Sequence, residues 1–179
     1  MAVLLAGPAS APKLVRCQTI LLSDPKIPQS KQPYHAALEL PEKEGKLATR
    51  KLSHVVHGVA KKSVCTLLKE AVGLQYGVRG AALVVGSMVD PATLHNEHIR
   101  AHGLEGQLFR TVLEDAFRAL KIPCEAFREK GAYESAAEML KRTPAQIKRA
   151  VAALGESHEG SWRAEEKLAA LAAWMALHA

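Results

Sequence analysis

Three histidines near the middle of the chain are residue types that could do chemistry together. His95, His98 and His102 lie close in sequence, with Glu97 and Glu105 beside them. On a helix, His98 and His102 would share one face because residues four apart are neighbours, and Glu105 would lie a further turn along. Two imidazoles and one carboxylate could bind a transition metal. We favour a polar or phosphate-contacting loop, because the segment lies at a solvated helix start and supplies no fourth ligand.

Four cations flank a second segment of interest, around a predicted helix start. They are Lys141, Arg142, Lys148 and Arg149. Between them, Thr143 is suited to capping a helix and Pro144 to its first position. A helix N-terminus beside several cations is a plausible contact for a phosphate group. A solvated helix face explains the same residues equally well, so both interpretations stay open.

The charge balance favours polyanionic partners. The chain has 179 residues, a formal net charge of +6 and an isoelectric point near 9.3. A surplus of this kind favours structured DNA or RNA, or an anionic surface. Apolar residues make up 48% and aromatic residues only 4%, which predicts a core of aliphatic side chains and closely packed helices.

The cysteines and the apolar runs indicate where the protein acts. Cys17, Cys65 and Cys124 are far apart and form no zinc-binding spacing. We expect reduced thiols that fill core space, and hence a cytoplasmic protein. No apolar run approaches the length of a membrane span, so no membrane partner is expected.

The first half of the chain predicts strands followed by a helix. Residues 13–23 are rich in aliphatic residues and predict a strand. After prolines that keep the chain extended, residues 34–40 predict a second strand, 41–45 a hairpin turn and 46–52 the return strand. Helical spacing of valines and leucines begins near residue 53, and Gly73 suits the end of that helix.

The second half predicts alternating strands and helices. Residues 81–85 form an apolar run between glycines, which is typical of a strand covered on both faces. A polar loop over 86–97 leads to a long helix, followed by a short strand at 122–127. Three more helices are expected, at 132–141, at 143–155 and from about 163 to 177. We therefore expect a flexible arm over residues 1–12 and one domain over 13–179.

Several short motifs match one known family. Residues 20–25 read Ile-Leu-Leu-Ser-Asp-Pro, residues 81–87 form an apolar strand before a polar loop with Asn96, and a Gly-Leu-Glu-Gly stretch follows at 103–106. Residues 162–169 then carry acidic residues before an Ala/Leu run. In order and spacing these motifs resemble RuvC-type Holliday-junction resolvases. The resemblance implies an α/β, ribonuclease H-like fold, with a mixed central sheet of about five strands flanked by helices.

The resemblance also implies an active site that this chain only partly keeps. Hydrolysis by this family would use Mg²⁺, which needs converging oxygen ligands. Asp24 and Glu166 match two of the family's carboxylates and would be catalytic and metal-binding, with Glu165 as a further metal ligand. Gly86 and Arg163 stand where two other carboxylates belong. A cation at Arg163 would repel Mg²⁺.

The expected function follows from these matches and departures. We expect a nucleic-acid-binding protein that resembles the junction endonucleases of DNA recombination, with nuclease activity lost or weakened. Mg²⁺ would be its cofactor only if the chain is active, and a homodimer is possible by analogy with the family. The alternatives are a non-catalytic component of a larger nucleic-acid assembly, and an interaction protein that uses its Ala-rich terminal helix.

Overall fold

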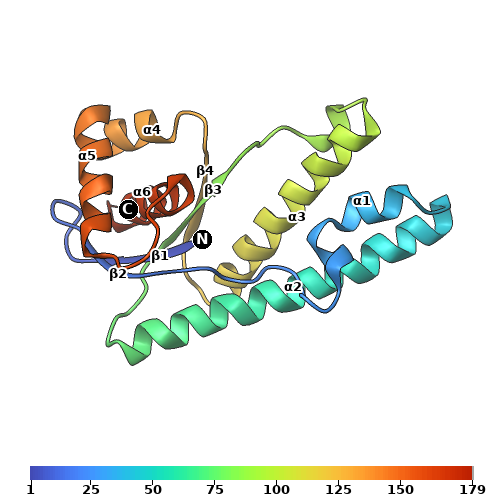
Figure 1. The fold of residues 1–179 in the computed structure, drawn as a ribbon, viewed down its shortest axis with the longest axis horizontal. Helices are drawn as coiled ribbons and strands as arrows, with labels where there is room; N and C mark the ends of the chain where they lie inside the picture. Colours follow the sequence, from blue (N-terminus) through green and yellow to red (C-terminus); the bar gives the residue numbers. More distant parts are fainter. Residues whose placement is uncertain (179) are drawn as a thin grey trace.

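The computed structural model describes residues 1–178 and is dominated by helices (Figure 1). The strands are β1 (Ala2–Ala6), β2 (Lys13–Gln18), β3 (Ala81–Val85) and β4 (Cys124–Arg128). The α-helices are α1 (Pro33–Leu38), α2 (Glu42–Gly73), α3 (Glu97–Ala119), α4 (Ala132–Met139), α5 (Pro144–Leu154) and α6 (Ala164–His178). Short 3-10 turns cover η1 (Pro28–Lys31), η2 (Pro91–Thr93) and η3 (Gly155–Ser157).

The strands form two separate pairs. Strands β1 and β2 are antiparallel, with an irregularity in register between Leu4 and Leu5. Strands β3 and β4 are parallel, with Ala81 opposite Cys124, and helix α3 connects them. Among residues 1–178 the sheets therefore have two strands each. The expected ribonuclease H-like central sheet of about five strands is wrong.

The fold prediction fails in residues 34–52. This stretch was expected to supply two strands and a hairpin turn, but it forms α1 and the beginning of α2 (Figure 1). Pro33 occupies the start of α1, a position where its fixed φ suits a helix. Glu42 and Glu44 lie in the first turn of α2, where acidic side chains favour a helix. Gly45 lies inside α2 and not in a turn.

Helices α1, α2 and α3 pack against one another. Helix α1 packs against both α2 and α3, and α2 packs against α3. A small helical core lies between α2 and α3. It consists of Val56, Ala60, Leu108 and Val112, with Leu22, Tyr34 and Phe109 packed against it. This packing fixes α1 beside the first turns of α3.

The second core lies at the other end of the molecule. It joins Leu5 of β1 to side chains of α4, α5 and α6, and Trp174 at its centre is fully buried. The indole Nε1 of Trp174 donates a hydrogen bond of 2.7 Å to the Ala9 carbonyl, in the turn between β1 and β2. Residues 2–6, within the segment expected to be a flexible arm, form strand β1 and contribute to this core.

Several predicted elements are confirmed. Strand β3 covers residues 81–85 as expected, although its residues are half-buried and its sheet has two strands. Thr143 caps α5 through a reciprocal pair of hydrogen bonds with Gln146, and Ile147 lies on the buried face. The chemistry of this cap is readable from sequence because it depends on neighbouring residues alone.

Within residues 1–178, no helix is long and apolar enough to cross a membrane.

Candidate metal centre

His35 is the histidine around which the candidate site is built. It lies in the first turn of α1, and its Nδ1 lies 2.9 Å from Oε2 of Glu105 on α3. Glu105 is only 6% exposed, so this pair is largely screened from water. A carboxylate accepts hydrogen bonds, which makes Nδ1 the protonated nitrogen of the His35 ring. The lone pair of the neutral ring is then on Nε2.

Glu105 also completes the N-terminus of α1. Its Oε1 accepts hydrogen bonds from the backbone N–H groups of Tyr34 and His35, each at 3.2 Å. These N–H groups belong to a helix start, where no carbonyl of the helix itself is available, and Gln32 supplies no side-chain cap. Burial and the nearby Glu105 charge raise the pKa of the Tyr34 hydroxyl. One buried carboxylate therefore holds both the backbone and the ring of His35.

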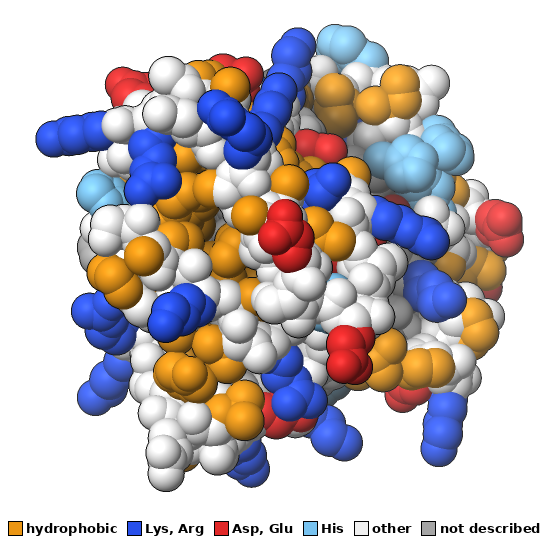
Figure 2. All heavy atoms as spheres, turned by 60° about the vertical axis from the view of Figure 1, so that its left-hand side comes forward, with side chains coloured by type: hydrophobic (Ala, Val, Ile, Leu, Met, Phe, Trp, Pro, Cys, Tyr) orange, Lys and Arg blue, Asp and Glu red, His pale blue; other side chains and the backbone are white. Residues whose placement is uncertain are grey.

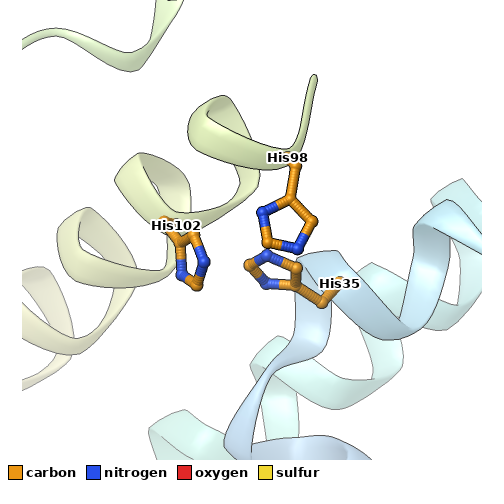
Figure 3. A group of neighbouring side chains, drawn as sticks. All are labelled: His35, His98 and His102. Atoms are coloured by element: carbon orange, nitrogen blue, oxygen red, sulfur yellow. The ribbon is translucent and has the colours of Figure 1, made fainter. Parts of the chain in front are cut away.

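His98 and His102 bring two further rings to His35. Both lie near the start of α3, four residues apart, so their side chains project from one helix face. The His35 ring centroid lies 4.5 Å from that of His98 and 4.1 Å from that of His102. Figure 3 shows the three rings pointing toward one another from two different helices.

The donor atoms of these rings are close enough to share an ion. One ring nitrogen from each of His35, His98 and His102 lies within 4.8 Å of the others. A tetrahedral zinc ion with bonds of 2.0–2.1 Å would separate its nitrogen ligands by about 3.3–3.4 Å. The ring nitrogens can move closer to that separation by rotation of the His98 and His102 side chains, because both residues are exposed.

The Nε2 atom of His35 supplies the observation that tests this fit. It is buried and has no hydrogen-bond partner among the described residues. An unpaired buried polar atom is unfavourable by about 1–3 kcal/mol. A metal ion bound by His98 and His102 would give this nitrogen the partner that it lacks. The residues therefore fit a metal with imidazole ligands, such as zinc, copper or nickel.

The histidines that lie together in the structure differ from the predicted group. His98 and His102 are brought together as expected, but His95 is not part of the group, which His35 completes. Glu105 was expected as a possible ligand, and its carboxylate instead bonds to His35 and to α1. His35 was missed because residues 34–40 were interpreted as a strand. The signal that could have found it is Pro33, which suits a helix start.

Asp24 lies in the turn after β2 and is held by local contacts. Its Oδ1 accepts a hydrogen bond of 2.8 Å from the Lys26 backbone N–H, and the Asp24 N–H donates to the Ser30 hydroxyl. These bonds are typical of an Asp-Pro turn. Among residues 1–178, Asp24 belongs to no cluster of three potential metal ligands.

Glu166 is buried at the start of α6. It accepts hydrogen bonds from the Arg163 backbone N–H at 2.8 Å and from the Ser161 hydroxyl at 3.1 Å. Backbone N–H groups, its own included, lower the pKa of this carboxyl, and Ser161 adds to the effect. The adjacent Glu165 is exposed. Neither residue joins a cluster of potential metal ligands in the described part of the chain.

The four predicted phosphate-binding cations differ in their surroundings. Arg142 donates to the Ser10 carbonyl at 2.9 Å and lies over the Trp174 ring, 5.2 Å from its centroid. Lys148 lies over the Tyr133 ring at 5.5 Å. Lys141 and Arg149 are exposed. Figure 2 shows basic side chains spread over the displayed face among acidic and hydrophobic ones.

Comparisons with known proteins place no constraint on this site. No family model matches the chain, and comparison with curated proteins and with solved structures gives no match.

Proposed function

We propose that the protein binds one divalent transition-metal ion, with zinc as the best fit, through His35, His98 and His102. The observation that carries the proposal is the buried, unpartnered Nε2 of His35, in a ring whose other nitrogen bonds to Glu105. A carboxylate behind a ligating histidine fixes the tautomer and raises the basicity of the ligand nitrogen.

Three imidazoles leave one position of a tetrahedral zinc ion for water or another small ligand. Zinc bound in this way lowers the pKa of its water and polarises carbonyl and phosphoryl oxygens. In this chain, His98 and His102 are exposed, so the open position would face solvent. His35 and Glu105 would anchor the ion from the buried side. This arrangement supports an accessible ion and not one enclosed within the core.

The test is a binding measurement on the purified chain after removal of metal with EDTA. We expect one Zn²⁺ per chain by calorimetry, and bound Co²⁺ with the intense visible absorption of a tetrahedral site. Replacing His35, His98 or His102 singly with Ala should weaken binding by more than the roughly 10- to 100-fold typical of a lost outer partner.

Two exposed histidines provide matched controls. His95→Ala removes a histidine next to the site in sequence, and His57→Ala removes one on α2. Both variants should keep the affinity of the unmodified chain. Equal losses in the controls and in the His98→Ala variant, or no stoichiometric binding by the unmodified chain, would overturn the proposal.

Binding of structured DNA or RNA is a second candidate, supported by the net charge of +6 and the exposed Lys141 and Arg149 near the start of α5. Nuclease chemistry with Mg²⁺ at Asp24 and Glu166 stays a prediction of the family resemblance. The carboxylates already accept local hydrogen bonds. A cytoplasmic location likewise stays a prediction, to which the free Cys17, Cys65 and Cys124 lend support.

A gel-shift assay tests the second candidate. The chain should retain duplex or branched DNA at about 50 mM salt and release it as salt rises, because contacts to phosphates release counterions. The double variant Lys141→Ala and Arg149→Ala should weaken retention of all sequences alike. The double variant Lys61→Ala and Lys62→Ala on α2 is the control for charge alone. Equal retention of DNA by both double variants would show that the start of α5 does not contact the DNA.

A further inference from the structure

A large cavity lies between the two sheets, away from the histidines. Its volume is about 830 Å³, within the roughly 300–1,000 Å³ range of ligand pockets. Strands β1 and β3 line two of its sides, α6 lines a third, and α2 with α3 lines the fourth. Figure 2 shows a hollow on one face of the molecule, with hydrophobic side chains in it and basic side chains around it.

The strands present their edges to this cavity. Every residue of β1 and of β3 lines it, whereas a strand that turned one face toward a cavity would contribute alternate residues. Each of these strands pairs on one side only, β1 with β2 and β3 with β4. The unpaired edge of each strand therefore borders the cavity.

The hydrogen bonds of β3 identify the peptide groups at its free edge. The Ala81 N–H donates to the Pro123 carbonyl, and the Val85 carbonyl accepts from the Glu129 N–H, both on the β4 side. Peptide groups of alternate residues point to the same side of a strand, so those of Leu83 also face β4. The N–H and C=O groups of Ala82 and Val84 point to the opposite side, which is the edge that borders the cavity.

The chemistry of the cavity selects an extended peptide. Two strand edges offer unpaired donors and acceptors, and the peptide groups of an extended backbone are suited to pair with such edges. A lipid chain has no groups to meet these donors and acceptors. Apolar side chains of two helices line the cavity, among them Leu168 and Ala173 on α6 and Phe109 and Leu113 on α3. Charged side chains line it as well, namely Arg16, Arg79, Arg110, Glu129 and Glu165. A strand covered on both faces is apolar throughout.

We propose that an extended apolar segment of a partner protein inserts between β1 and β3. The segment would match the five residues of each bordering strand. It would convert the two sheets into one, in the order β2, β1, partner strand, β3, β4. Main-chain pairing would supply affinity, and the apolar faces would select uncharged side chains. This inference is independent of the metal site, which lies on α1 and α3.

The experiment uses a capped probe peptide, Val-Leu-Ala-Leu-Val, with Gly-Lys at each end for solubility and a fluorophore at one end. Its control is the same peptide with alternate amides N-methylated, which keeps the side chains and removes backbone donors. Only the unmethylated probe should bind. At saturation, hydrogen exchange at Ala82 and Val84 should slow at least tenfold, while exchange at Leu83, already paired to β4, should change little.

A variant that fills the cavity provides the second readout. Ala169→Phe adds a ring on α6 at a residue that lines the cavity, and should lower probe affinity at least tenfold. Ala152→Phe adds the same ring at an exposed residue of α5 and should leave the affinity unchanged. Circular dichroism and Zn²⁺ binding should be the same for both variants, which separates loss of the peptide site from misfolding.

Three results would overturn the inference. The first is equal binding of the methylated and unmethylated probes, which would indicate a purely apolar ligand. The second is protection of Ala82 and Val84 as strong as that of Leu83 in the protein alone, which would mean that the edges are already paired. The third is a probe that dissociates an oligomer of this chain, which would make a second copy the occupant.

Discussion

Glu105 is the residue on which the geometry of the metal centre depends most. One of its oxygens accepts two backbone N–H groups of α1, and the other accepts the Nδ1–H of His35. The same carboxylate therefore positions a helix and orients a ligand ring. Its burial strengthens these bonds, since little water competes for the oxygens.

Replacing Glu105 with Gln separates its two roles. The amide oxygen can still accept the N–H groups of Tyr34 and His35, but the amide nitrogen cannot accept from His35 Nδ1. We expect Zn²⁺ affinity to fall by about 10- to 100-fold while the helical content stays unchanged. Calorimetry and circular dichroism measure the two effects. Glu97→Gln, at an exposed residue of the same helix, should change neither, and an unaffected Zn²⁺ affinity in Glu105→Gln would contradict the assigned role.

Glu166 makes a pH-dependent contribution to stability. Hydrogen bonds from backbone N–H groups lower its pKa from the ordinary value of 4.5. A carboxyl with a lowered pKa in the folded state stabilises the protein above pH 4.5, and this stabilisation is lost as pH falls through the folded-state value. Urea unfolding should show Glu166→Gln less stable than the unmodified chain at pH 7, with the difference shrinking toward zero in acid.

The neighbouring glutamate is the control for this effect. Glu165→Gln removes the same charge from the same helical turn at an exposed residue. Its stability difference from the unmodified chain should be small at both pH values. A loss in Glu165→Gln equal to that in Glu166→Gln would assign the effect to the helix dipole and not to the hydrogen bonds of Glu166.

The site residues divide into those that local sequence could reveal and those that it could not. His98 and His102 were predictable as a pair because their spacing alone places them on one helix face. His35 comes from a segment 70 residues away from Glu105, and only the packing of α1 against α3 brings it near. Asp24 and Glu166 accept hydrogen bonds from backbone N–H groups two and three residues away, so their roles in a turn and at a helix start depend on local sequence alone.

At the scale of elements, the contact between α1 and α2 explains why residues 34–52 were misinterpreted. Gly45 was assigned to a hairpin turn because glycine often marks turns. In the structure it lies within α2, where a Cβ atom would be 2.8 Å from the Ala37 carbonyl oxygen of α1. The glycine allows two helices to approach closely. Sequence periodicity cannot distinguish this role of glycine from a turn. Strand β3 was predictable from its continuous apolar run, and α5 from the capping residue at its start.

Gly45→Ala should therefore destabilise the protein, by about 1–3 kcal/mol if the helices must shift to accommodate the methyl group. Because α1 carries His35, Zn²⁺ affinity should fall as well. Gly58→Ala is the control on the same helix, since no atom lies within 4 Å of the position of its added Cβ. That variant should gain about 0.5–1 kcal/mol from reduced backbone freedom in the unfolded chain. Chemical denaturation distinguishes the two, and a gain in both would disprove close packing at Gly45.

At the scale of the whole molecule, two small cores stabilise two ends of the structure. The helical core joins α2 to α3, and the second core joins β1 to the last three helices. Composition predicted the aliphatic character of both cores, but not their separation. The expected central sheet would have supplied one continuous core, and it required strands from residues that are helical.

Metal binding should stabilise the end of the molecule that holds the helical core. An ion bound to His35 and to both histidines of α3 joins α1 to α3. At a free Zn²⁺ concentration about 100 times the dissociation constant, the folded state should gain about 2.7 kcal/mol. The midpoint of thermal unfolding should rise with Zn²⁺ and return to its starting value with EDTA. The His98→Ala variant should show a smaller rise, and an unchanged midpoint in the unmodified chain would contradict the link.

The hydrogen bond from Trp174 to the Ala9 carbonyl joins residues 165 positions apart, so its two partners are synthesised at different times. On the ribosome, β1 and β2 are synthesised before α6 and can pair with each other as soon as Gln18 has emerged. Helix α6, which covers their turn and buries Leu5, is synthesised after them. In the interval, the apolar face of β1 is not yet covered by α6. The nascent chain is therefore more exposed to aggregation, and more dependent on chaperones, before α6 has left the exit tunnel than afterwards.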